Sequence, residues 1–124
     1  GIQHIALGTD DIYMAVEEMS ANGVPFQNTP DTYYEKVDER VAGHGEDLER
    51  LKDLRVLIDG APTDDQGILL QIFTQDEIGP VFFELIQRKG NEGFGEGNFQ
   101  ALFESIELDQ VRRGVLEDNE SKTA

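Results

Sequence analysis

The chain has 124 residues and a formal net charge of −16, from 26 acidic side chains against 10 lysines and arginines. Nucleic acid and anionic membrane surfaces would be repelled at long range, so we expect neither as a partner. There is no cysteine, which excludes disulfides and thiolate metal sites and is typical of a cytoplasmic protein. No apolar run approaches the roughly 18 residues that a membrane span needs.

The first part of the chain predicts a strand followed by a helix. Residues 2–7 alternate as in a strand that places His4 on an apolar face. Asp10 and Asp11 then suit the positive end of a helix dipole, and Gly23 stands where a C-cap glycine is expected. Because the sequence starts within this strand, we expect a piece of a longer protein.

The middle of the chain predicts two short helices and then three strands. The helices are expected over 32–41 and 46–54, with a Gly-His-Gly loop between them. The strands are expected over 55–58, 68–74 and 81–87, with turns at 59–60 and 64–67.

The last part predicts a glycine-rich loop and an amphipathic helix. Asn98 follows the loop 93–97 and is a good N-cap residue. Apolar residues then recur with helical spacing, as Phe99, Leu102, Phe103 and Ile106. We expect Gly114 to close this helix and residues 117–124 to form a polar, flexible tail. The element order predicts an α+β fold, with a sheet covered by helices.

Three polar residues on expected strands are candidates for chemistry. Glu84 lies in an apolar run and needs pairing, protonation or a metal; a salt bridge or a solvent-facing edge position remains the alternative. His4 is either a satisfied core residue or a ligand. One histidine and one carboxylate on separate strands resemble two arms of the non-haem iron triad. Gln71 needs hydrogen-bond partners if buried, unless it sits at an edge in water.

Other features of the chain favour no site. His44, the only other histidine, is expected to be exposed in its Gly-His-Gly loop. Phe99 and Phe103 are expected in the core. The loop 93–97 has the wrong spacing for a dinucleotide-binding loop, and Glu96 would repel phosphate.

Six motifs, in this order and spacing, resemble the 4-hydroxyphenylpyruvate dioxygenase family. The resemblance covers the chain up to Leu116. The motifs are Gly1-Ile2-Gln3-His4-Ile5-Ala6, Tyr33-Tyr34-Glu35, Leu69-Leu70-Gln71-Ile72-Phe73-Thr74, Phe83-Glu84-Leu85-Ile86-Gln87-Arg88, Gly93-Phe94-Gly95-Glu96-Gly97-Asn98-Phe99 and Ala101-Leu102-Phe103-Glu104. The implied fold is a βαβββ module of the vicinal oxygen chelate superfamily over residues 1–116, ending in a gating helix.

The resemblance also implies roles for single residues. His4 and Glu84 would be ligands of Fe(II). The family's first histidine ligand lies on a preceding module that is absent here. Gln71, Phe73 and Phe99 would act in catalysis, with the two rings flanking the substrate. The implied substrate-binding residues are Gln3, Gln71, Phe73, Phe94 and Phe99, although strand alternation aims Gln3 away from His4.

The implied reaction converts 4-hydroxyphenylpyruvate and O₂ to homogentisate and CO₂ in tyrosine and phenylalanine catabolism. We expect the piece alone to be inactive and to form a homo-oligomer through an exposed strand edge. One alternative is a hydroxymandelate synthase, in which an aliphatic residue replaces Phe99. The other is a self-pairing βαβββ module without catalysis. Two ligands of one iron should lie roughly 3–4 Å apart, since each metal bond is about 2 Å.

Overall fold

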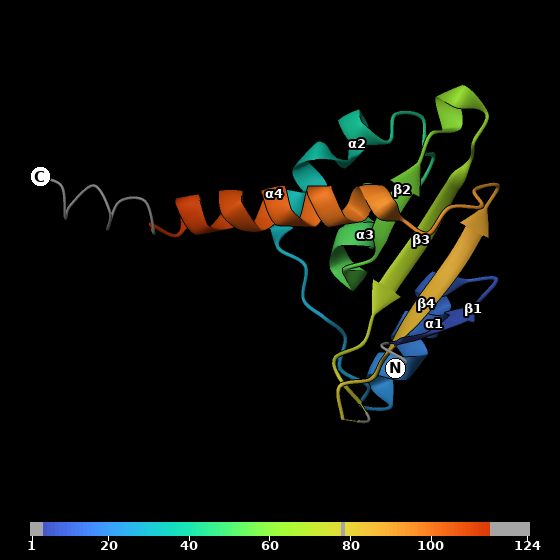
Figure 1. The fold of residues 1–124 in the computed structure, drawn as a ribbon, viewed down its shortest axis with the longest axis vertical. Coiled ribbons are helices and arrows are strands. Elements are labelled where there is room, and N and C mark those ends of the chain that lie inside the picture. The colour runs from blue at the N-terminus through green and yellow to red at the C-terminus, as the bar shows by residue number, and fades with distance from the viewer. Residues whose placement is uncertain (1–3, 78, 115–124) are drawn as a thin grey trace, which may run out of the picture.

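A four-stranded mixed sheet organises the chain, with strands in the order β1-β4-β3-β2. The computed structural model describes residues 4–77 and 79–114. β1 (His4–Gly8) runs parallel to β4 (Phe82–Lys89), while β3 (Ile68–Phe73) is antiparallel to both β4 and β2 (Leu57–Gly60). β1 and β2 therefore form the two edges. The predicted α+β fold with βαβββ order is confirmed (Figure 1).

The helix α1 (Ile12–Ala21) follows β1, as the sequence predicts. Its N-cap is Asp11, whose side chain accepts a hydrogen bond from the amide of Met14. Ile12 and Val16 are buried in the core. Gly23 ends the helix at a φ of +88°, a conformation that costs glycine little.

The segment between α1 and β2 closes the core from one side. It contains the 3₁₀ helix η1 (Asp31–Lys36) and the short helices α2 (Val37–Arg40) and α3 (Leu48–Leu54), close to the two predicted helices. Another 3₁₀ turn, η2 (Pro62–Asp64), follows β2. The main core consists of apolar residues that are at most 4% exposed: Ile12, Val16, Tyr33, Tyr34, Val37, Val41, Leu51, Val56, Leu57, Ile58, Ile68, Leu70, Ile72 and Leu85.

The long helix α4 (Glu96–Arg112) runs over the β2 side of the sheet and η1, and its C-terminal turns project past them (Figure 1). The prediction of Asn98 as N-cap is wrong. Gly95 holds the cap position, and the carboxylate of Asp59 on β2 accepts a 2.8 Å hydrogen bond from the amide of Gly97. The side chain of Asn98 is freed to face the sheet, where it is buried.

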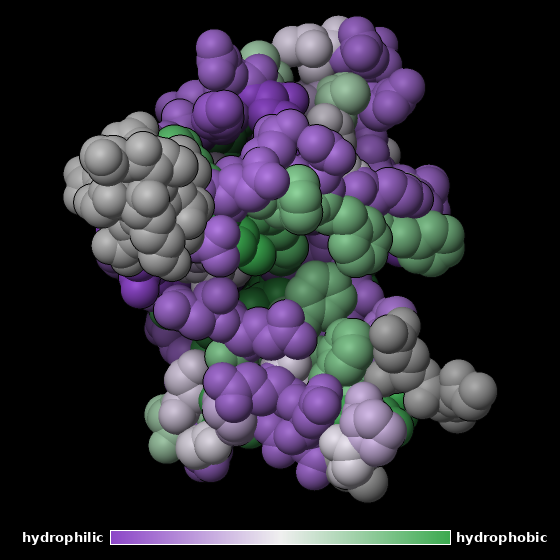
Figure 2. All heavy atoms as spheres, turned by 60° about the vertical axis from the view of Figure 1, so that its left-hand side comes forward, coloured by the Kyte–Doolittle hydropathy of each residue, from purple (hydrophilic) through white to green (hydrophobic). Residues whose placement is uncertain are grey.

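Large apolar side chains of α4 face outward, so the predicted core positions of Phe99 and Phe103 are wrong. Phe99 is 70% exposed and Phe103 is 60% exposed. Hydrophobic side chains gather in a band at about the height of α4 and just below it, between hydrophilic surfaces (Figure 2). The sheet is covered instead by the α4 positions of Asn98, Ala101 and Leu102, while Ser105 faces η1, where its carbonyl accepts a hydrogen bond from Thr32.

Two further predictions need correction. The second strand begins at Leu57, because Arg55 takes a left-handed conformation (φ +59°) that ends α3, and the predicted turn 59–60 belongs to β2. The side chain of His44 is only 8% exposed. Its Nδ1 accepts from the amide of Glu46, and its Nε2 lies 2.7 Å from the carboxylate of Asp38. The imidazole of His44 thus links Asp38 to the amide of Glu46 and stabilises the loop that joins α2 and α3.

In the described ranges, no helix has the length and apolar character needed to cross a bilayer.

Candidate metal centre

The imidazole of His4 and the carboxylate of Glu84 meet on one face of the sheet. The parallel register places Ala6 beside Glu84 and His4 beside Phe82, so His4 and Glu84 are on neighbouring strands. The Nε2 of His4 lies 3.3 Å from the Oε1 of Glu84. This distance agrees with the predicted separation of two ligands of one ion.

Glu84 is a buried carboxylate on an interior strand, which excludes the predicted alternative of an edge position in water. It is 6% exposed. Its Oε2 accepts a 2.9 Å hydrogen bond from the Nε2 of Gln71. The nearest basic group to Oε1 within ion-pair distance is His4. One oxygen of Glu84 is therefore fixed by the protein, and the other faces the imidazole.

Gln71 is buried on the interior strand β3, so the edge position considered for it is excluded. Besides Glu84, its Nε2 faces the carbonyl of Phe94 at 3.4 Å. Its Oε1 accepts a 2.7 Å hydrogen bond from the Nδ2 of Asn98. Gly95 lies so close that an added Cβ would stand 1.8 Å from the Oε1 of Gln71. The glycine-rich loop is thus required for the close approach of α4 to this glutamine.

Aromatic rings adjoin the His4–Glu84 pair. The ring of Phe82 stacks on His4, with centroids 5.3 Å apart and an interplanar angle of 10°. Phe73 meets Phe82 edge to face at 5.9 Å. Phe94 is 74% exposed in the loop before α4. No ring contact joins Phe73 to Phe99 in the part of the chain that the structure describes, so their pairing around a substrate stays a prediction.

Sequence reasoning missed two residues of the site. Phe82 shares its strand face with Glu84 by simple alternation, and this signal could have identified it. Asn98 shares one α4 face with Ala101 and Ser105, a weaker signal. The predicted residue Gln3 lies outside the described residues.

The pair fits part of a metal site. Imidazole nitrogen with carboxylate oxygen suits Fe(II) among other divalent ions. Across the described ranges, no group of three or more histidine, cysteine, aspartate or glutamate side chains could hold a metal ion. His44 is engaged by Asp38 and Glu46. The described residues therefore bring two donors of a candidate metal site together.

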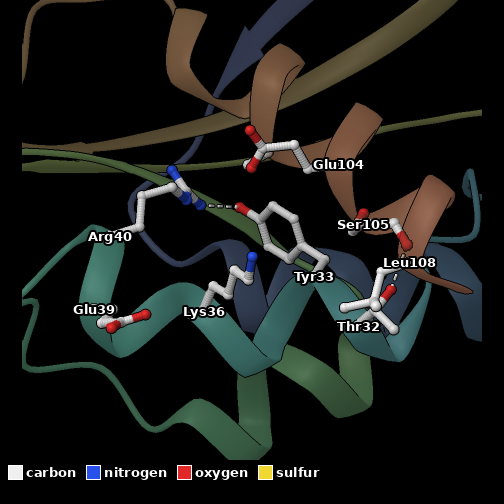
Figure 3. Close-up of a pocket in the computed structure, with 9 residues that line it drawn as sticks. Thr32, Tyr33, Lys36, Glu39, Arg40, Glu104, Ser105 and Leu108 are labelled. Carbon is white, nitrogen blue, oxygen red and sulfur yellow. Dashed lines mark hydrogen bonds between the residues drawn. The ribbon is translucent and has the colours of Figure 1, made fainter.

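A cavity of about 320 Å³ lies apart from the predicted site residues, between η1, α2 and α4 (Figure 3). Tyr33 and Arg40 form part of its wall, with Glu104, Ser105 and Leu108 contributed by α4. None of the residues predicted to bind metal or substrate lines this cavity.

The fold and the site define the class of protein. Residues 1–72 match the model of the Glyoxalase/Bleomycin resistance protein/Dioxygenase superfamily, and the chain belongs to this superfamily.

Particular relatives are similar over nearly the whole chain. The chain is 74% identical over 116 residues to 4-hydroxyphenylpyruvate dioxygenase of Pseudomonas aeruginosa, a match that covers 94% of this chain and 32% of that protein. It is equally similar, over the same shares, to Hemolysin VllY of Vibrio vulnificus. Among solved structures, a triple mutant of 4-hydroxymandelate synthase from Streptomyces coelicolor is 38% identical with a TM-score of 0.69, covering 89% of this chain and 31% of that one.

The chain spans about a third of the length of these relatives. The resemblance that the six motifs predict is confirmed, since relatives carrying that family's name match the chain at high identity.

Proposed function

We propose that this chain forms the metal-binding module of an Fe(II)-dependent dioxygenase that converts 4-hydroxyphenylpyruvate and O₂ to homogentisate and CO₂. One observation carries the proposal: the Nε2 of His4 and the Oε1 of Glu84 converge to 3.3 Å on neighbouring strands. The 74% identity to a protein named 4-hydroxyphenylpyruvate dioxygenase supports the same reaction.

In this proposal the protein supplies ligands and orientation. Iron, when bound, supplies the redox chemistry that O₂ activation requires. His4 and the Oε1 of Glu84 would hold it, while Gln71 fixes the Oε2 of Glu84 at 2.9 Å. A ligating carboxylate held by a neighbouring hydrogen bond has one available oxygen and a defined direction.

The aromatic residues would bind the substrate ring and exclude water. Phe82 already stacks on His4, and Phe73 packs edge to face on Phe82. Phe94, in the loop before α4, and Phe99, in the first turn of α4, present exposed rings, and we assign them to the same pocket. Gln3 and Gln71 remain the predicted polar contacts of the substrate. An exposed aromatic surface of this kind is typical of a binding site.

A complete site needs more than this chain. The sequence contains two histidines, and one of them is bound to Asp38 and Glu46. We infer that a second imidazole ligand comes from outside the chain and that the 124 residues alone do not turn over. All five residues of β1 are exposed, so we also propose association between copies along this edge.

The test is product analysis with the protein at its natural length. The protein is loaded with Fe(II) without air and then given 4-hydroxyphenylpyruvate and O₂. The proposal expects homogentisate and CO₂ in equal amounts, none without Fe(II), and none from the 124-residue chain alone. A loaded protein that makes 4-hydroxymandelate, or no product, would contradict the proposed reaction.

A further inference from the structure

A continuous chain of hydrogen bonds, buried except for its last, partly buried bond, leads from Glu84 to the opposite edge of the sheet. Gln71 donates to Glu84 at 2.9 Å, and Asn98 donates to Gln71 at 2.7 Å. The hydroxyl of Tyr33 donates to the Oδ1 of Asn98 at 2.5 Å. The Nη2 of Arg40 donates to the hydroxyl of Tyr33 at 2.8 Å. These hydrogen bonds join five elements in the order β4, β3, α4, η1 and α2.

The direction of every bond in this chain is fixed by its two ends. The carboxylate of Glu84 can only accept, so the amide of Gln71 must present nitrogen to it. The oxygen of Gln71 then accepts from the nitrogen of Asn98, which leaves the oxygen of Asn98 toward Tyr33. Arg40 can only donate, so it forces the hydroxyl of Tyr33 to accept from it.

The hydroxyl of Tyr33 has one proton and two candidate acceptors, which are Asn98 and the carbonyl of Ile58. Arg40 donates a 2.9 Å hydrogen bond to the carbonyl of Ile58, so the proton of the Tyr33 hydroxyl is available to Asn98. The second lone pair of the hydroxyl accepts from the amide of Ile58 at 3.0 Å. The hydroxyl of Tyr33 thus donates one hydrogen bond and accepts two. It cannot rotate without losing at least one of them.

We propose that Tyr33 and Arg40 are positioning residues for the metal ligand Glu84. They hold the amide of Asn98 in one orientation, which holds Gln71, which in turn occupies the Oε2 of Glu84 and leaves Oε1 for the metal. This inference rests on the proposed function. Partners behind a metal ligand commonly change metal affinity or activity by about 10- to 100-fold when they are removed.

The position of Arg40 fits this role. Figure 3 shows its side chain reaching from α2 toward the hydroxyl of Tyr33, beneath α4. Its Nη1 lies 3.5 Å from the carboxylate of Asp59, which also holds the amide of Gly97. Arg40 and Asp59 therefore fix the same turn of α4 that carries Asn98. The positioning chain and the start of the helix share one anchor.

The test compares two tyrosine variants in the protein at its natural length. Tyr33→Phe removes the hydroxyl that holds Asn98. Tyr34→Phe is the matched control. Tyr34 is the next residue and is equally buried. Its hydroxyl donates to the carbonyl of Val56 at 3.1 Å, a hydrogen bond that is not part of the series from Arg40 to Glu84. Fe(II) dissociation constants are measured without air, together with the visible absorption of the Co(II)-loaded proteins and the melting temperature.

We expect Tyr33→Phe to weaken Fe(II) binding about tenfold and to shift the Co(II) absorption bands. Tyr34→Phe should leave both at wild-type values, even where its melting temperature falls. Equal Fe(II) affinities and unchanged Co(II) spectra in wild type and Tyr33→Phe would overturn the inference. So would equal losses in both variants, because these would show a general loss of packing.

A second variant keeps the inference testable if Tyr33→Phe does not fold. Asn98→Asp preserves size but places oxygen against the Oε1 of Gln71. The inference expects weaker Fe(II) binding and the same spectral shift; wild-type values for both would overturn it. If the wild-type protein binds Fe(II) and the Tyr33 and Asn98 variants bind it equally well, only the positioning chain is refuted. A wild-type protein that binds no Fe(II) refutes the proposed function itself.

Discussion

The two edges of the sheet differ sharply in how they are supported. At the β2 edge, the amide and carbonyl of Ile58 are bonded by Tyr33 and Arg40, and Ile58 is completely buried. At the β1 edge, all five residues are exposed, and Leu7 is 44% exposed. One edge is covered by η1, α2 and α4, whereas among the described strands the other edge pairs only with β4.

This difference divides the candidate metal centre into two unequal arms. The carboxylate arm, Glu84, is buried and held by a chain of hydrogen bonds that reaches the β2 edge. The imidazole arm, His4, has a side chain that is 40% exposed and a stacked contact with Phe82. This chain therefore fixes the direction of the Glu84 carboxylate through its own contacts, whereas the direction of the His4 ring depends on how β1 is held.

The largest expected effect comes from removing each arm in turn. Both Glu84→Gln and His4→Ala should lower turnover by at least about a hundredfold, because each removes a proposed metal ligand. Only Glu84→Gln should also lower the free energy of unfolding, by about 1–3 kcal/mol, because it disturbs a buried charge-assisted hydrogen bond. Denaturant unfolding of the metal-free proteins checks this, with the exposed Glu92→Gln as control. Equal destabilisation by both ligand variants would contradict the two-arm description.

A second comparison uses leucines on the same face of the sheet. Leu70 is completely buried on β3, whereas Leu7 is 44% exposed on β1. We expect Leu70→Ala to cost about 2–5 kcal/mol through lost burial and a cavity. Leu7→Ala should cost less than about 1 kcal/mol. Thermal unfolding measures both, and a comparable cost for Leu7→Ala would show that β1 is packed in solution.

Gly95 and Gly45 test how closely α4 must approach Gln71. Both have a positive φ, +77° and +73°, so alanine at either position costs roughly 1–2 kcal/mol of backbone strain. Only at Gly95 would the new Cβ meet Gln71, whereas at Gly45 it meets nothing within 4 Å. Gly95→Ala should therefore cost a further ~1–3 kcal/mol and weaken Fe(II) binding. Identical unfolding free energies for the two variants would show that Gln71 leaves room for a side chain at position 95.

The smallest expected effect is a pH dependence on the β2 side. A hydrogen bond from Arg55 and its charge lower the pKa of the Asp31 carboxyl below its ordinary value of 3.8. The unfolded chain then binds a proton at higher pH than the folded one does. The stabilisation is therefore complete above that ordinary value and is lost as the pH falls through the lower, folded pKa.

Melting temperatures of wild type and Asp31→Asn should consequently differ slightly at neutral pH and converge in acid. Asp76→Asn removes the same charge elsewhere on the surface and serves as control. A difference that persists unchanged in strong acid would rule out this ion pair as the cause.

Local sequence patterns predicted the elements of the fold and the two ligand candidates. Period-two alternation placed Glu84 and Gln71 on strands, and the structure confirms both positions. Alternation could not show that His4 and Glu84 lie on adjacent strands, since strand order depends on the whole chain. That expectation came from the motif resemblance, and the 3.3 Å distance agrees with it.

The wrong predictions share a physical cause, which is a partner distant in sequence. Asn98 looked like a helix cap, but Asp59 supplies the cap from β2 and Asn98 bonds to Gln71 and Tyr33. His44 looked exposed, but Asp38 and the amide of Glu46 bind its ring. Phe99 and Phe103 follow a helical apolar stripe, yet the sheet contacts another face of α4.

The most direct test of the central claim is the position of iron in crystals of the full-length protein, located by anomalous scattering at the iron absorption edge. The account predicts one peak about 2 Å from both the Nε2 of His4 and the Oε1 of Glu84, with the Oε2 of Glu84 still bonded to Gln71. Iron bound at another place, or coordinated by neither side chain, would contradict it.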